Sequence, residues 1–136
     1  MLEYQNVVLE EVELVHLDYS YFLYNILVDH KEVGRLTYRL GKDEDFILDG
    51  HIGYEIDEPY RGHHYAYHAC MALKNKIKEY SDHVLITCDI DNYASKKTIE
   101  KLGAIYLETK AIPKKLKDYY PGSTGKLVYQ WNIGGE

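Results

Sequence analysis

Residues 50–66, GHIGYEIDEPYRGHHYA, decide the fold of this chain of 136 residues. The large apolar residues Ile52, Tyr54 and Ile56 alternate with smaller or charged ones, which is typical of a strand. The sequence then passes through Asp-Glu-Pro-Tyr and Arg-Gly-His-His into a segment with helical spacing. The first turn of a helix presents backbone N–H groups without intrahelical partners, and the helix dipole adds partial positive charge. We therefore expect this junction between strand and helix to bind the phosphates of a cofactor.

The apolar patterns on either side predict further strands and one more helix. Alternation and turn signals predict strands over residues 7–17, 21–28, 32–40, 46–57, 84–89, 104–109 and 126–133, the fourth with a break near residues 49–50. Apolar steps of three and four predict helices over residues 63–80 and 93–102. The order strand, helix, strand after residue 50 implies a right-handed crossover between two parallel strands, while the flanking strands indicate hairpins. We expect an α/β (α+β) fold in which both helices pack on a mixed, mostly antiparallel sheet with a central parallel β-α-β unit.

The composition predicts one globular domain over residues 1–136. The sequence has no run of about 18 apolar residues, and its start, MLEYQNVVLEEVELV, lacks the basic and apolar regions of a secretory signal. Cys70 and Cys88 are more typical of free core thiols than of a disulfide. The net charge of −6 disfavours nucleic acid and is compatible with a cationic acceptor such as an amine. We therefore expect a cytoplasmic protein that binds neither nucleic acid nor membrane.

The two least ordinary segments follow the two strands that are expected to be parallel. Residues 57–61 follow the first of these strands, and residues 89–92 follow the second. Ligands of such sheets bind beyond the carboxyl ends of parallel strands. Both segments are therefore expected at the binding site.

Motifs in these same two regions resemble the GNAT superfamily of acetyl-CoA-dependent N-acetyltransferases. Residues 61–66, RGHHYA, are similar to the pyrophosphate loop of the family, R/Q-x-x-G-x-G/A. Residues 92–95, NYAS, and 100–104, EKLGA, resemble the N-x-x-S…E-K-L-G-F pattern of the branch that acetylates protein N-termini, including those of ribosomal proteins. The resemblance extends in element order over residues 20–133. It implies that the two central parallel strands splay apart and that the cofactor enters the gap.

The resemblance also implies acetyl-CoA as cosubstrate and assigns residues to it. The pyrophosphate is expected at the backbone of the RGHHYA loop, the pantetheine amides at the backbone of the preceding strand, and the pantetheine arm beside the second motif. The residues so implied are Ile56, Arg61, Gly62, His63, His64, Tyr65, Ala66, Asn92 and Ser95. The acceptor is expected to be a primary amine, either of a small molecule or of a peptide N-terminus.

Two positions depart from the family pattern. His64 replaces the first glycine of the loop, and we expect a side chain to be tolerated there if the backbone is already helical, with weakened binding. Ile99 stands where many relatives carry a tyrosine that protonates the departing CoA thiolate. Because a thiolate is a fair leaving group, the loss of this acid need not abolish turnover.

Glu55 is the leading candidate for the base that deprotonates the amine, and Asp57 shares its strand face and is expected to assist. A solvated strand residue is the alternative interpretation of Glu55. Three nearby histidines, at positions 63, 64 and 68, suggest a metal site, but no further ligand follows at a suitable spacing, so we expect none.

Only residues 18–20 separate the first two expected strands, where the family usually has two helices that help to form the acceptor pocket. The acceptor side is therefore expected to be open or completed by a second copy, which predicts a homodimer. Two functions stay open: an N-acetyltransferase, and a non-catalytic acyl-CoA-binding or regulatory module that keeps the cleft without turnover. The residue at position 99 and the missing helices favour the second slightly, while family analogy favours the first.

Overall fold

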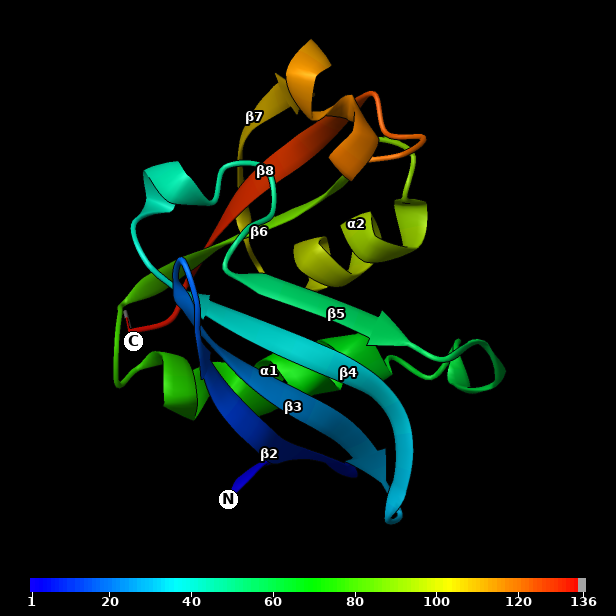
Figure 1. The fold of residues 1–136 in the computed structure, drawn as a ribbon. Coiled ribbons are helices and arrows are strands. Elements are labelled where there is room, and N and C mark those ends of the chain that lie inside the picture. Colours follow the sequence, from blue (N-terminus) through cyan, green and yellow to red (C-terminus); the bar gives the residue numbers. More distant parts are fainter. Residues whose placement is uncertain (135–136) are drawn as a thin grey trace.

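The computed structural model describes residues 1–134, whose strands form two antiparallel sheets (Figure 1). The first sheet has the order β1-β2-β3-β4-β5, with bounds Leu2–Tyr4, Val7–His16, Ser20–Val28, Lys31–Leu40 and Ile52–Ile56. The second has the order β6-β8-β7, with bounds His83–Asp89, Gly125–Asn132 and Ile105–Ala111. The helices are α1 (Tyr65–Ile77) and α2 (Tyr93–Lys101), with short 3₁₀ turns η1 (Asp43–Asp45), η2 (Glu58–Tyr60) and η3 (Lys114–Tyr119).

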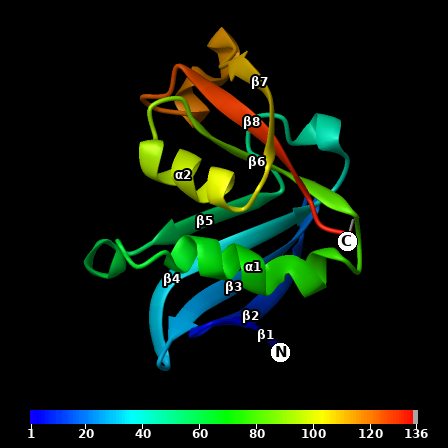
Figure 2. The same cartoon turned by 180° about the vertical axis from the view of Figure 1, so that it is seen from behind.

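The core lies between the first sheet and α1, which crosses one face of that sheet (Figure 2). Alternate residues of β3 are buried, and Tyr24 and Ile26 are among them. They meet a stripe of α1 that includes Leu73 and Ile77, both fully buried. Burying each such side chain contributes about 1.5–3 kcal/mol. The helix is therefore fixed on the sheet by the apolar spacing that predicted it.

The strands β5 and β6 run in the same direction and diverge along their length (Figure 1). The backbone N–H of His51 donates to the carbonyl of Leu85 at 2.8 Å, where the two sheets meet. Within residues 1–134, β5 and β6 belong to separate sheets beyond this contact. The expected splay of the two parallel strands is confirmed, with its closed end at His51.

Gly50 permits the sheets to approach at this closed end. Its φ of +71° lies in the left-handed region, and a Cβ there would sit 3.0 Å from the Leu85 carbonyl oxygen. The ring of His51 is 4% exposed, and its Nδ1 accepts from the Leu85 N–H at 2.9 Å. Its Nε2 lies 3.0 Å from the Gly41 carbonyl, so this nitrogen carries the proton and donates. The imidazole thereby joins the two sheets as a neutral ring.

The sequence predicted most elements within a few residues of their observed bounds, with three differences. The break expected near residues 49–50 is present as a sharp turn at Gly50, but the strand begins only after it, at Ile52. The helix expected from residue 63 begins at Tyr65, since His64 is left-handed. The short β1 was not predicted, because three residues carry too little periodicity. The short turn between β2 and β3 is confirmed at residues 17–19.

The closed end predicts a pH dependence of stability. Burial lowers the pKa of His51, so the unfolded chain takes up this proton first, and the stability contributed by the neutral ring is lost as the pH falls below about 6.5. His83 acts in the opposite sense, since Asp82 and Asp43 raise its pKa and its contribution is present at low pH.

We expect His51→Gln, whose amide can both accept and donate, to lose less stability than the native protein between about pH 7.5 and about pH 5.5. Urea unfolding at the two pH values measures this, with His83→Gln as the matched variant that should lose more than the native protein. Equal pH dependence of His51→Gln and the native protein would contradict the assignment of a neutral His51.

Candidate active site

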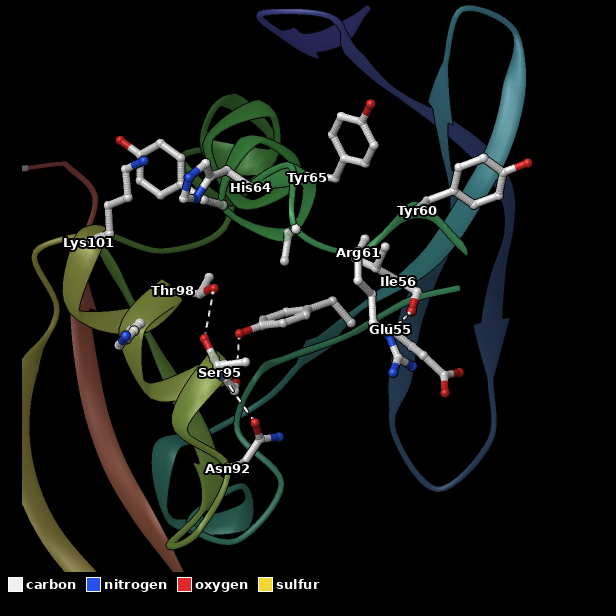
Figure 3. A pocket seen from close by; sticks show the side chains of 16 residues that line it. Glu55, Ile56, Tyr60, Arg61, His64, Tyr65, Asn92, Ser95, Thr98 and Lys101 are labelled. Carbon is white, nitrogen blue, oxygen red and sulfur yellow. Dashed lines mark hydrogen bonds between the residues drawn. The ribbon is translucent and has the colours of Figure 1, made fainter. Parts of the chain in front are cut away.

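A cavity of about 710 Å³ opens between β5, the start of α1 and α2 (Figure 3). Its lining comes from the strand, from the loop that leads into α1 and from one side of α2. The lining residues are Tyr54, Glu55, Ile56, Tyr60, Arg61, Gly62, His64, Tyr65, Ala66, Tyr67, Asn92, Ala94, Ser95, Lys97, Thr98 and Lys101. The structure thus brings together the two motifs that the sequence placed at the ends of the parallel strands.

The start of α1 faces this cavity without a side-chain cap from the described residues. The first intrahelical bond runs from the His68 N–H to the His64 carbonyl at 3.0 Å. The N–H groups of Tyr65, Ala66 and Tyr67 precede it and have no intrahelical acceptor. They are available to an anion at the positive end of the helix dipole.

His64 occupies a backbone conformation that favours glycine. Its φ and ψ are +63° and +22°, and the preceding Gly62 has a φ of +91°. The condition on which a side chain was expected to be tolerated, a helical backbone, is therefore not met, and the left-handed conformation costs a non-glycine residue about 1–2 kcal/mol. The left-handed backbone at this position explains why the family pattern has a glycine here.

Arg61 turns back toward the strand. Its Nε donates to the Ile56 carbonyl at 2.8 Å. An amide ligand that pairs with the backbone of Ile56 would replace this bond and free the guanidinium for a phosphate. Both residues line the cavity, and the pantetheine contact and the phosphate contact assigned to them stay predictions.

The start of α2 is ordered by a cap. The side chain of Asn92 accepts from the Ser95 N–H at 3.1 Å, which holds the first turn of the helix. The hydroxyl of Ser95 in turn lies 2.8 Å from the hydroxyl of Tyr54 on β5 (Figure 3). The sequence predicted Asn92 and Ser95 at the site but missed Tyr54, whose alternation indicated ordinary sheet packing.

Three cations line the cavity and favour an anionic ligand. Arg61 lies at the loop, and Lys97 and Lys101 lie one turn apart on α2. Glu55 is the carboxylate among the lining residues, and it is exposed. Sequence reasoning missed both lysines, although their spacing of four residues after the NYAS motif was a usable signal.

The remaining predicted residues lie apart from the cavity or at its margin. Asp57 and His63 are outside the lining, and the ring of His63 lies 5.2 Å from that of Tyr65. Glu55 points to the face of β5 opposite Tyr54 and stands across from Arg35 in the strand register. Among residues 1–134, no group of three His, Cys, Asp or Glu side chains is arranged to hold a metal ion.

Ile99, at the place of the family tyrosine, and the two cysteines are buried. Ile99 is 0% exposed, and Cys88 at the end of β6 is 5% exposed. Burial raises the pKa of Cys88, and it raises that of Cys70 to about 12, so both are neutral thiols. In the described part of the chain, α1 and α2 are too short and polar to cross a membrane.

Comparison with known proteins identifies the family. The family model described as "Acetyltransferase (GNAT) domain" matches residues 9–105, which is well over half of the chain. The chain therefore belongs to the GNAT acetyltransferase family, as its motifs predicted. No curated protein sequence matches it.

Solved structures share the fold. A RimL ribosomal L7/L12 alpha-N-protein acetyltransferase in complex with CoA superposes with a TM-score of 0.69 at 18% identity, covering 88% of this chain and 65% of its own. An acetyltransferase from Salmonella typhimurium that modifies the N-terminal serine of L7/L12 superposes with a TM-score of 0.65 at 20% identity. The match covers 85% of this chain and 64% of that one. The microcin C7 self-immunity acetyltransferase MccE, in complex with acetyl-CoA and AMP, superposes with a TM-score of 0.61 at 19% identity. The match covers 83% of this chain and 61% of that one. This chain spans slightly less than two thirds of their length, and the predicted fold is confirmed.

The left-handed His64 predicts a stabilising substitution. His64→Gly removes the strain and restores some unfolded-state entropy, which leaves a gain of about 0.5–1 kcal/mol. The smaller residue also lets a ligand approach the helix start, so we expect CoA affinity to rise about two- to tenfold. Thermal unfolding and calorimetry measure the two effects.

His30→Gly is the matched control, because His30 is also left-handed, with a φ of +68°, and lies in the turn between β3 and β4, outside the cavity. It should gain a similar stability and leave CoA affinity unchanged. A His64→Gly variant that is less stable than the native protein would show that the left-handed conformation is not the source of strain.

Proposed function

We propose that this protein transfers the acetyl group of acetyl-CoA to a primary amine, either of a small molecule or of a peptide or protein N-terminus. The observation that carries the proposal is the uncapped start of α1, which faces the cavity between β5 and α2. The strand β5 and the strand β6, which precedes α2, are joined at one end only. Such an arrangement admits a long, flexible chain between the strands and holds a diphosphate at the mouth.

The residues of the cavity fit acetyl-CoA. The free N–H groups of Tyr65, Ala66 and Tyr67 suit the pyrophosphate, and Lys97 and Lys101 supply complementary charge. The backbone around Ile56 suits the pantetheine amides, as in strand addition. Acetyl-CoA supplies an acetyl group activated as a thioester.

We assign the catalytic base to Glu55, with Asp57 as its assistant on the same strand face. The amine must lose a proton to become nucleophilic, and an exposed carboxylate passes that proton to water. Glu55 lies on the face of β5 opposite Tyr54, so the acceptor arrives from the side opposite the cavity and attacks directly in a ternary complex.

The alternative is a non-catalytic acyl-CoA-binding module, which the buried Ile99 in the place of a catalytic tyrosine favours. Thiol release from acetyl-CoA against a panel of amines and peptides separates the two. Release that requires an amine supports the transferase, and calorimetric binding of CoA without release supports the module. Absence of CoA binding by the native protein contradicts both.

Glu55→Gln should lower kcat about ten- to a hundredfold and leave acetyl-CoA affinity unchanged, because the amide cannot accept the proton. Glu58→Gln is the control, since Glu58 is exposed in η2 and lies outside the cavity lining. Equal kcat values for Glu55→Gln and the native protein would remove Glu55 from the mechanism.

We also propose that two copies pair and complete the acceptor side, and that the protein works in the cytoplasm, where its buried free thiols stay reduced. The edge strand β7 supports pairing, since Ile105, Tyr106 and Leu107 are 55%, 52% and 46% exposed.

Light scattering at micromolar concentration should give the mass of a dimer, and Leu107→Lys should shift it toward the monomer by placing a charge on the exposed edge. Lys78→Glu, at the far end of α1, is the control for a surface change and should leave the dimer intact. A monomeric native protein would end this part of the proposal.

A further inference from the structure

The hydroxyl of Tyr54 lies inside the cavity rather than in the sheet core. Its side chain extends from the inner face of β5, and its oxygen meets Ser95 Oγ on α2 at 2.8 Å. Ser95 is itself held in place by Asn92 at the start of the helix. A phenol from the strand therefore spans the gap to the helix and is fixed at its tip.

This hydroxyl contacts the turn of α2 over which the side chain of a tyrosine at position 99 would lie. Ser95 and Ile99 are one turn apart on the same side of α2. Side chains of a helix tilt toward its N-terminus, so a tyrosine at position 99 would lie over the turn that contains Ser95. Ile99 is fully buried and supplies no polar group, while Tyr54 reaches that turn from the opposite wall.

Tyr54 also lies at the depth expected for the sulfur of the cofactor. A strand rises about 3.3 Å per residue, so Tyr54 is about 7 Å nearer the closed end than Ile56. The backbone of Ile56 is the proposed contact of the pantetheine amides, and the sulfur ends that arm beyond them. The phenol and the sulfur are thus placed at the same level between the strands.

We propose that Tyr54 is a catalytic residue whose hydroxyl donates a hydrogen bond to the sulfur of CoA as it leaves, with Ser95 as its positioning residue. The inference rests on the proposed acetyltransferase function. In the step, the amine nitrogen attacks the thioester carbon, the C–N bond forms, and the C–S bond breaks with its electron pair going to sulfur. The extra proton of the nitrogen passes to the base and then to water.

The proton of Tyr54 stays on its oxygen during this step. Burial raises the pKa of Tyr54 above its ordinary value, whereas a thiol ionises near about 8.5. The phenol is thus the weaker acid and stabilises the thiolate by a charge-assisted hydrogen bond. Ser95 can donate to the phenol oxygen at the same time and keep it oriented.

A binding experiment tests this contact without turnover. A hydrogen bond to the thiolate lowers the pKa of the bound CoA thiol, so CoA affinity should rise about three- to tenfold between about pH 7 and about pH 9. Acetyl-CoA has the same phosphates but no ionisable thiol, so it serves as the control ligand and its affinity should not show this rise. Tyr54→Phe should remove the rise for CoA and keep acetyl-CoA affinity within about threefold, as calorimetry measures.

Kinetics provide the second readout. Tyr54→Phe should lower kcat about ten- to a hundredfold with little change in the KM for acetyl-CoA. Ser95→Ala keeps the phenol but removes its partner, and its kcat should fall by a smaller factor. Tyr80→Phe is the matched control at the far end of α1, where the ring is 51% exposed, and its kcat should be that of the native protein.

Three outcomes overturn the proposal: the same pH dependence for CoA and acetyl-CoA in the native protein, an unchanged kcat in Tyr54→Phe, and no binding of CoA at all. The last also removes the proposed function. A native protein whose CoA affinity rises with pH but that releases no thiol keeps the contact between Tyr54 and sulfur and loses only the transferase activity. The first of these outcomes needs no variant, so the proposal can be overturned even if Tyr54→Phe fails to fold.

Discussion

A buried imidazole holds the two sheets of this protein together at one end. The ring of His51 accepts a hydrogen bond from the backbone N–H of Leu85, and the backbone N–H of His51 donates to the carbonyl of Leu85. Gly50, which has no side chain, lets the two chain segments come this close. A charged ring would lose the acceptor that this arrangement needs. The described strands β5 and β6 separate beyond this point, and α2 follows β6 in the chain. The placement of α2 opposite β5, and hence the cavity between them, therefore depends on the contact at the closed end.

Because side chains alternate along β5, the two faces of this strand carry residues with different roles. Tyr54 and Ile56 point toward α1 and α2 and form one wall of the cavity, while Glu55 points to the opposite face. After β5 the chain passes through the left-handed residues Gly62 and His64 and enters α1. The free N–H groups at the start of α1 face the same cavity. One short run of sequence thus supplies a wall, an anion site and a candidate base on the other side.

Local sequence patterns predict much of this arrangement, and the remaining features depend on contacts between residues distant in sequence. The alternation of β3 and the stripe of α1 were readable because burial on one face imposes a period. The break near Gly50 was expected as well, but its close contact with Leu85, distant in sequence, was not. Tyr54 meets Ser95 across 41 residues, so alternation alone classed it with the packed rings of the sheet. The motif identified His64 as unusual, but only the backbone angles gave the reason.

The order of the first sheet bears on how the chain reaches this state. Each of its strands, from β1 to β5, pairs with its neighbour in sequence, and residues 17–19 suffice to connect β2 to β3. Short loops close at small entropic cost, so this meander can assemble hairpin by hairpin. The contact between His51 and Leu85 spans 34 residues and includes the whole of α1, which makes it a late event. All strands of the larger sheet are therefore present in a growing chain before the residues that pack on it and complete the ligand site.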